Sequence, residues 1–298
     1  KLAELEVLAL QKNAATLVFD QELTPTQQRN LSQITERKVL DRTQLILDIF
    51  AQHAQTREGK LQVEMAQLKY MMPRLVGQNR AMSRLAGGIG GRGPGETRLE
   101  MDRRKIRERI AQIKTELTSV RKHRKSTRSR RDKAGLPIVS LVGYTNAGKS
   151  TLLNTLTKSQ VLAENKLFAT LDPTSRRLRF PEDREIILSD TVGFIRHLPA
   201  DLREAFMATL EELESADVLV HVADASHPEM DVQVEAVESI LRDLSIDAIP
   251  RILALNKSDR ISDETRETLA FVHHDAVFIS AMDRPTLTPL VERIKSAL

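Results

Sequence analysis

The spacing of apolar residues changes twice along the chain and divides it into three parts. In the first part, residues 15–20 (ATLVFD) and 37–40 are short β-rich runs that alternate with helical patterns. Thr24 followed by Pro25 predicts an N-cap and the first position of a helix. The alternation predicts part of a small N-terminal α/β subdomain over residues 1–57, and this part shows no catalytic constellation.

The second part has a helical period. Apolar residues recur at steps of four and three in two stretches, one on each side of a glycine-rich break. This pattern predicts two helices that pack seam to seam. We interpret it as an antiparallel helical hairpin over residues 58–133. The two stripes are Leu61, Met65, Leu68, Met72 and Leu75, then Ile106, Ile110, Ile113, Leu117 and Val120.

The break, GGIGGRGPG at residues 87–95, holds six of the chain's 12 glycines. Its G-x-G-x-x-G spacing is that of a dinucleotide site, but such a site follows a strand, whereas this stretch follows a helix. The glycines could simply turn the chain, yet a helix-to-helix turn needs only a few residues. We interpret Gly87–Thr97 as a hairpin tip that brings backbone close to a phosphate surface.

Charge is unevenly distributed along a chain whose net charge is only +4. Between Met71 and Lys133 there are 19 Lys and Arg against 6 Asp and Glu, a surplus of 13, so the remainder carries 4 − 13 = −9. The segment Arg121–Lys133 alone has eight basic residues and one acidic residue. This asymmetry favours contact with an RNA or DNA backbone. Since aromatic residues make up 3% of the chain, base stacking is not the expected mode.

The bulk composition limits where the protein works. The sequence has no cysteine, no signal peptide and no apolar run long enough to span a bilayer. We expect a cytoplasmic monomer. The chain begins in helical rhythm without an initiator Met, so we also expect it to be a piece of a longer protein.

The third part, residues 137–298, alternates strand, loop and helix and predicts a mostly parallel sheet with flanking helices. IVSLVGYTNAGKSTLLN puts an apolar strand before a G-x-x-x-x-G-K-S sequence and a helix after it, the context of a P-loop. Its backbone N–H groups would cradle the β-phosphate, Lys149 would reach the β- and γ-phosphates, and Ser150 would ligate Mg²⁺. The predicted contacts are Gly143, Tyr144, Thr145, Asn146, Ala147, Gly148, Lys149, Ser150 and Thr151.

The sequence NKSD at residues 256–259 follows another apolar strand and predicts a guanine base, so GTP and GDP are the expected ligands. Asp259 would accept hydrogen bonds from N1–H and the amino group of guanine, which adenine lacks. The stem of Lys257 would stack on the base, and Asn256 would tie this loop to the P-loop. A backbone N–H after the last strand would meet the guanine O6. The predicted base contacts are Asn256, Lys257, Ser258, Asp259, Ser280, Ala281 and Met282.

Two loops between these motifs are predicted to sense the γ-phosphate and to be released on hydrolysis. Asp190 would hold Mg²⁺ through water, and the Gly193 N–H would bond the γ-phosphate. Thr170 would ligate Mg²⁺ in the triphosphate state, with Thr174 as the competing candidate. Lys149, Thr170 and Gly193 are therefore the predicted catalytic residues. The predicted switch contacts are Phe168, Ala169, Thr170, Leu171, Asp172, Asp190, Thr191, Val192 and Gly193.

The residue after Gly193 is Phe194, where many GTPases have a Gln that orients the attacking water. Phe194 cannot hold a water, so intrinsic hydrolysis should be slow and a partner should supply what is missing. His197 is the nearest alternative base in sequence, and we disfavour it. Asn146 could help to coordinate a monovalent cation such as K⁺.

These motifs resemble the bacterial HflX family of GTPases. The resemblance rests on GYTNAGKST, FATLDPT, DTVGFIRHLP and NKSD, together with the upstream GGIGGRGPGETRLE, and it covers essentially the whole chain. It implies binding to the 50S ribosomal subunit and a role in ribosome splitting or rescue. It also implies that the tip reaches 23S rRNA near the peptidyl-transferase centre and that the ribosome raises the rate of hydrolysis. Members usually have further residues at the N-terminus and commonly Ile in place of Ser258, a change we expect to be neutral.

Two alternatives belong to other functional classes. The chain could be an RNA-binding module in which the nucleotide only gates affinity, or a GTPase that serves a non-ribosomal RNA client. The glycine-rich tip disfavours the second alternative, because G domains of that kind carry other partner modules.

Overall fold

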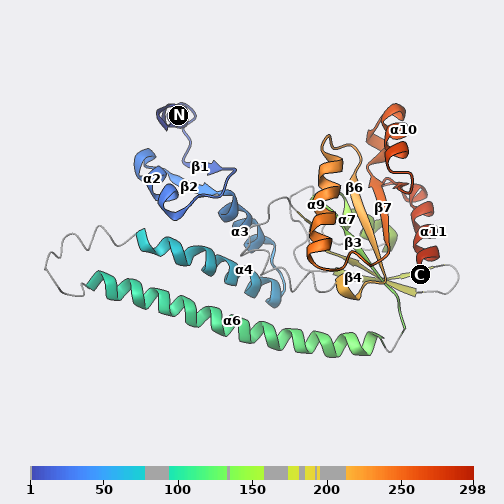
Figure 1. Cartoon of the computed structure of the whole chain (residues 1–298), viewed down its shortest axis with the longest axis horizontal. Coiled ribbons are helices and arrows are strands. Elements are labelled where there is room, and N and C mark those ends of the chain that lie inside the picture. Colours follow the sequence, from blue (N-terminus) through green and yellow to red (C-terminus); the bar gives the residue numbers. More distant parts are fainter. Residues whose placement is uncertain are drawn as a thin grey trace. The chain divides into compact units, whose positions relative to one another are not determined.

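A computed structural model of the chain describes residues 2–77, 94–132, 135–157, 174–180, 185–191, 193–194 and 213–298 (Figure 1). The chain divides into two compact units. One comprises Lys1–Gln52 and Lys60–Lys122, and the other comprises His53–Gly59 and His123–Leu298. No helix among the described residues is long and apolar enough to cross a membrane.

The first unit begins with a small α/β subdomain. Its parallel strands β1 and β2 pair in register, with Thr16 opposite Lys38. The predicted N-cap is confirmed: Thr24 Oγ1 accepts a hydrogen bond from Gln27 N at 3.2 Å, and the Gln27 side chain accepts one from Thr24 N at 2.9 Å. The elements are α1 (Leu2–Gln11), β1 (Thr16–Phe19), α2 (Pro25–Thr35), β2 (Lys38–Asp41) and α3 (Arg42–His53).

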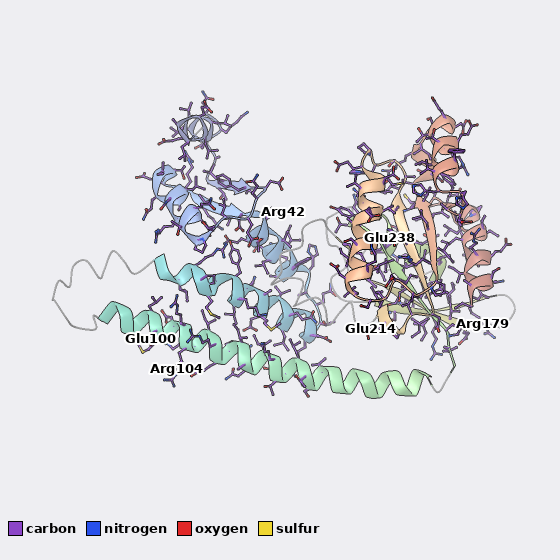
Figure 2. The ribbon with its side chains drawn as sticks, in the orientation of Figure 1. Arg42, Glu100, Arg104, Arg179, Glu214 and Glu238 are labelled. Carbon is purple, nitrogen blue, oxygen red and sulfur yellow. The ribbon has the colours of Figure 1, made fainter. Side chains whose placement is uncertain are left out.

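An antiparallel helical hairpin follows, formed by α4 (Arg57–Met71) and α6 (Pro94–Asp132) (Figure 1). The apolar stripe predicted on the second helix faces the interior of this unit: Ile110, Ile113 and Leu117 are buried, and the residues at its two ends are half-buried. Arg109 joins the two helices through a bidentate ion pair with Glu64, at 2.7 and 2.8 Å. Arg104, labelled in Figure 2, is 80% exposed and pairs with Glu108 along the helix.

The two ends of the break differ from the sequence expectation. The first helix stops at Met71 and continues as the 3₁₀ helix η1 (Met72–Gly77), because Pro73 lacks the N–H that an α-helix needs. The second helix starts at Pro94, so residues 94–97 of the predicted tip are helical. Proline suits the first helical position, where its missing N–H costs nothing. Residues 87–93 of the tip lie outside the described residues.

A buried charge cluster makes the α/β subdomain and the hairpin one unit. Asp41 is fully buried, and its Oδ2 accepts hydrogen bonds from Leu23 N and Arg74 Nη2, both at 3.2 Å. Arg74 also donates to Leu23 O at 2.8 Å and to Gln28 Oε1 at 3.1 Å. The guanidinium lies 3.4 Å from the centroid of the Tyr70 ring. Burial, then the neighbouring Asp41 carboxylate, raises the pKa of that phenol.

The second unit contains a six-stranded sheet of order β4-β5-β3-β6-β7-β8, in which β4 is antiparallel and the other strands are parallel. The prediction of a mostly parallel sheet with flanking helices is confirmed. The strands are β3 (Ile138–Val142), β4 (Thr174–Arg179), β5 (Glu185–Asp190), β6 (Val218–Asp224), β7 (Arg251–Asn256) and β8 (Val277–Phe278). The helices are α7 (Lys149–Thr157), α9 (Met230–Asp243), α10 (Asp263–Val272) and α11 (Thr288–Ala297), with the 3₁₀ turns η2 (Leu213–Ser215), η3 (Ser258–Arg260) and η4 (Arg284–Leu287).

Strand β6 is buried at every position from Val218 to Ala223, as expected for a central strand covered on both faces. His221 in this strand lies 3.4 Å from Oε1 of Glu238 on α9, which Figure 2 labels. The hydrogen bond from His221 lowers the pKa of the Glu238 carboxyl against the opposing effect of burial. The centre of the sheet is therefore fully buried, and a buried histidine on it pairs with a helix.

Replacing Arg74 by Met should lower the free energy of unfolding by about 2 kcal/mol, because Asp41 would keep its burial but lose its cationic partner. Urea unfolding of the full chain, followed by circular dichroism, measures the loss. Arg104→Met is the matched control, since its ion pair is exposed, and it should leave the midpoint unchanged. If the two variants lowered the free energy of unfolding equally, the buried cluster would contribute no more to stability than an exposed ion pair.

Candidate nucleotide site

The polar residues predicted to bind nucleotide lie after the carboxyl ends of the parallel strands, the edge at which open α/β sheets hold ligands. The P-loop follows β3. Asp190 is the last residue of β5, and Asn256 is the last residue of β7, with the rest of the NKSD sequence after it. Residues 280–282 follow β8. The parallel pairing of these strands therefore brings together segments that are far apart in the sequence.

Two P-loop glycines are required by their surroundings. Gly143 has φ +150°, and a Cβ there would lie 2.1 Å from the carbonyl oxygen of Val222. Gly148 has φ +98°, and a Cβ there would lie 2.2 Å from Nδ2 of Asn256. Asn146 adopts the left-handed conformation between them, with φ +63°. The loop is therefore too tightly enclosed for a side chain at either glycine. Without those side chains, its backbone can lie close to a bound ligand.

Lys149 is the first residue of α7, and its side chain folds back over the P-loop. Its Nζ donates to Gly143 O at 3.0 Å and to Tyr144 O at 2.9 Å. Burial lowers the pKa of Lys149 to about 8, against a smaller opposing effect of Asp190. An ammonium that has lost its hydration in this way gains most from an anion, so the position suits a phosphate.

The two predicted magnesium ligands that the structure describes lie together. Ser150 Oγ donates to Asp190 Oδ2 at 2.6 Å, and Asp190 is fully buried. A hydroxyl and a carboxylate are the hard oxygen donors that Mg²⁺ prefers, so these residues fit the ion. No cluster of three or more His, Cys, Asp or Glu side chains in the described part of the chain could hold a metal.

The residues after β5 are joined to the P-loop by a short β-bridge between Tyr144 and Phe194. Phe194 N donates to Gly143 O at 3.1 Å, and Thr145 N donates to Phe194 O at 2.9 Å. A Cβ on Gly193 would lie 2.8 Å from Thr145 Cγ2 and 3.2 Å from Lys149 Nζ. Gly193 is therefore in contact with the phosphate-binding end of the site, and only a glycine fits there.

Phe194 itself points away from the site. It is 6% exposed and packs in a cluster with Val142, Leu213, Leu219 and Val237. Preceding it, Thr191 Oγ1 donates to Leu141 O at 2.7 Å and anchors this segment to β3. The sequence analysis inferred that Phe194 cannot hold a water, and its place in the core agrees with that inference.

The base loop is tied to the P-loop through Asn256. Its Nδ2 donates to Ala147 O at 2.7 Å, and its Oδ1 accepts from Ala281 N at 2.8 Å. Ser280 N donates to Thr286 Oγ1 at 2.9 Å. The backbone N–H groups of Ser280 and Ala281, two of the predicted base contacts, thus already have acceptors within the protein. An incoming O6 would have to share the Ala281 donor or replace its acceptor.

Lys257 and Asp259 form the rest of the base loop. Lys257 has a left-handed backbone, with φ +62°, and its Nζ lies 2.6 Å from Asp224 Oδ2. Asp259 is 54% exposed and open to a ligand. Sequence reasoning missed Asp224, although the signal was present: an acidic residue that ends an apolar strand. Burial would raise the pKa of Asp224, but hydrogen bonds from Lys257 and Ser226 outweigh it and hold the pKa below its usual value.

Several predicted contacts cannot be placed. Phe168, Ala169, Thr170, Leu171, Asp172 and Val192 lie outside the described residues, as does the disfavoured base His197. The backbone of Thr174, the competitor of Thr170, begins β4 and pairs in register with Asp190. Met282 is 81% exposed.

Comparison with known proteins agrees with this geometry. Residues 1–51 match the GTP-binding GTPase N-terminal family, residues 53–131 match the GTP-binding GTPase middle region, and residues 138–257 match the 50S ribosome-binding GTPase family. GTPase HflX of Caldanaerobacter subterraneus subsp. tengcongensis is 51% identical over 298 residues, which is 100% of this chain and 68% of that protein. The chain belongs to the HflX family of GTPases. GTPase HflX of Escherichia coli is 51% identical over 88% of this chain and 62% of that protein.

Solved structures agree with the HflX assignment. The crystal structure of SsGBP in complex with GDP has a TM-score of 0.59 and 28% identity, and the match covers 99% of this chain and 85% of that one. A GTP-binding protein from the hyperthermophilic archaeon Sulfolobus solfataricus in complex with GDP has a TM-score of 0.53 at 28% identity, covering 100% of this chain and 85% of that one. Both relatives carry GDP, in agreement with a guanine-nucleotide site in this HflX GTPase.

Gly143→Ala should lower the free energy of unfolding by about 3 kcal/mol and abolish GDP binding, because the new Cβ meets a backbone carbonyl that cannot move aside. Urea unfolding and titration with a fluorescent GDP analogue measure both effects. Gly135→Ala is the control: Gly135 also has positive φ, at +63°, but nothing lies within 4 Å of a Cβ there. Gly135→Ala should lower the free energy of unfolding by about 1 kcal/mol and retain GDP binding. Normal GDP binding by Gly143→Ala would contradict the described loop.

Phe194→Gln should leave intrinsic GTP hydrolysis slow, because this side chain is directed into the core and not toward the nucleotide. It should also lower the free energy of unfolding by about 2 kcal/mol, since an amide would be buried. Single-turnover hydrolysis and urea unfolding test the two statements. Phe271→Gln, at a position 89% exposed, is the control for stability. A marked rise in the intrinsic rate of Phe194→Gln would show that the segment turns toward the nucleotide.

Proposed function

We propose that this HflX GTPase hydrolyses GTP slowly alone and rapidly on the large ribosomal subunit, where it acts as a splitting or rescue factor. The observation that carries the proposal is the position of Phe194. The residue that would orient water in many GTPases is buried in the core here and bonded to the P-loop backbone. A GTPase built in this way depends on a partner to complete its catalytic site.

The hairpin supports an RNA partner. Arg103, Arg107 and Lys114 recur at helical spacing on one flank of α6, next to its buried seam, and the last two are exposed. These three side chains would offer positive charge to phosphate, and the sequence of the segment Arg121–Lys133 would add further basic residues. The glycine-rich tip Gly87–Thr97 would supply the contact with 23S rRNA. The match of residues 138–257 to a 50S ribosome-binding GTPase family favours the ribosome as that partner. Because the proposed partner is the ribosome, we also propose that the protein is cytoplasmic. We further propose that it is a monomer.

The residues of the site would share the chemistry as follows. The Lys149 ammonium would neutralise charge on the β- and γ-phosphates, and the Gly193 N–H would bond the γ-phosphate. Ser150 and Thr170 would hold Mg²⁺ directly and Asp190 through water, and the bound ion supplies positive charge to the phosphate oxygens. Asn146, fixed in a left-handed conformation within the P-loop, would help to hold K⁺.

The proposal is tested by the rate of GTP hydrolysis with and without purified 50S subunits, at fixed Mg²⁺ and K⁺. We expect the 50S subunit to raise the rate by at least about 100-fold, the scale at which a supplied catalytic group acts. Binding without stimulation would replace the proposal with a nucleotide-gated RNA-binding module. If the 50S subunit neither binds nor stimulates, the client is not the ribosome and another RNA must be sought.

Asp259→Asn should change the preferred base from guanine to xanthine. An amide can donate a hydrogen bond to the xanthine O2, but it cannot accept hydrogen bonds from both N1–H and the amino group of guanine. We expect the Kd for GDP to rise by about 100-fold and the Kd for XDP to fall, measured by competition against fluorescent nucleotide. Asp263→Asn, an exposed acid four residues away, should bind both nucleotides as the wild type does. Unchanged GDP binding by Asp259→Asn would remove Asp259 from the base site.

A further inference from the structure

We infer that Asp224 is a positioning residue of the guanine pocket: it anchors the Lys257 ammonium so that the aliphatic stem of Lys257 forms a wall against the base. This inference rests on the proposed binding of guanine nucleotides at the same site. Asp224 lies outside the P-loop and the NKSD sequence, and its proposed role is to shape the pocket without touching the base edge.

The sheet places Asp224 beside the base loop. Strands β6 and β7 are parallel neighbours, and Asp224 is in register with Asn256, the residue before Lys257. Directly after Asp224, Ala225 N donates to Asn256 O at 2.9 Å, so the two strand ends stay paired where their loops begin. The carboxylate therefore starts from a backbone position that is fixed relative to the base loop.

Both oxygens of the carboxylate are engaged. Oδ2 lies 2.6 Å from Lys257 Nζ, while Oδ1 accepts from Ser226 Oγ at 2.7 Å and from Ser226 N at 3.1 Å. The side chains of Lys257 and Asp224 are only 17% and 14% exposed, so water screens this ion pair less than a surface pair. The lowered pKa of the Asp224 carboxyl agrees with a carboxylate that stays ionised. Ser226 orients the anion, and the anion orients the lysine.

Lys257 has little freedom at its other end. Its backbone is left-handed, with φ +62°, and its O accepts from Arg260 N at 2.9 Å. The next residue, Ser258, donates its N–H to Ile279 O at 3.1 Å. Because the backbone and the ammonium of Lys257 are both fixed, the methylene groups between them form a defined apolar surface within the base loop. Release of the ammonium would let the stem move into solvent and remove that surface.

A wall of this kind does not read the base edge. Loss of Asp224 should therefore weaken the binding of different purine bases by the same factor, unlike loss of Asp259, which changes preference between bases. This difference separates a positioning role from a base-reading role, and dependence on Lys257 separates it from a general effect on folding.

The experiment measures the Kd for GDP in the full chain by competition with fluorescent nucleotide. Asp224→Asn, which keeps the shape and removes the charge, should raise the Kd by about tenfold, the scale of one charge-assisted hydrogen bond. Lys257→Met should raise it similarly, and adding Asp224→Asn to Lys257→Met should have no further effect. In an Asp259→Asn background, Asp224→Asn should raise the Kd for XDP by the same factor. The control is Asp231→Asn, whose carboxylate lies 2.8 Å from His273 Nε2 and does not contact Lys257. This variant should bind GDP as the wild type does.

The possible outcomes separate this inference from the proposed function. If Asp259→Asn fails to shift base preference, the guanine site itself is wrong and the proposed function falls with it. If Asp259→Asn behaves as expected but Asp224→Asn leaves the Kd unchanged, or weakens GDP equally in the Lys257→Met background, only the role of Asp224 is overturned. Should Asp224→Asn fail to fold, as judged by circular dichroism, wild-type affinity in Lys257→Met alone would still overturn the inference.

Discussion

The nucleotide site depends on the side-chain amide of Asn256. This amide is 2% exposed, and it donates to Ala147 O of the P-loop while accepting from Ala281 N after the last strand. Thr155 Oγ1, on the helix that follows the P-loop, completes the connection with a hydrogen bond of 2.6 Å to Ala281 O. A buried amide that is satisfied on both sides is costly to disturb, so it fixes the distance between the phosphate end and the base end of the pocket. The absence of a side chain at Gly148 follows from the same contact, because a Cβ would occupy the place of the amide nitrogen.

The phosphate end is organised by a different constraint, the backbone bridge between Phe194 and the P-loop. It brings the Gly193 backbone close to Lys149, but it directs the next side chain into the apolar core. The arrangement favours recognition of the phosphate over activation of water. Under the function proposed above, nucleotide binding and hydrolysis would be separate steps, and a partner would control the second.

The first unit follows the same principle of a few buried polar contacts that fix larger elements. Asp41 caps α3 by accepting a hydrogen bond from Gln44 N at 2.8 Å. It also accepts one from Leu23 N and pairs with Arg74 in η1, which follows the first hairpin helix. The α/β subdomain and the end of the first hairpin helix that leads to the glycine-rich break are therefore held together by this cluster.

The sequence by itself determined the features whose signal is local. The P-loop, the N-cap at Thr24, the hairpin stripe through Ile113 and the alternation of strands and helices depend on residues within a few turns of one another, and their spacing alone specifies them. Even there, element ends were imprecise: Pro73 ended an α-helix early and Pro94 began another inside the expected tip. The tertiary structure alone decided the burial of Phe194 and the pairing of Asp224 with Lys257 and of Asp41 with Arg74. Each of these pairs joins residues separated by 33 positions, and strand register and helix packing, which no local pattern encodes, bring them together.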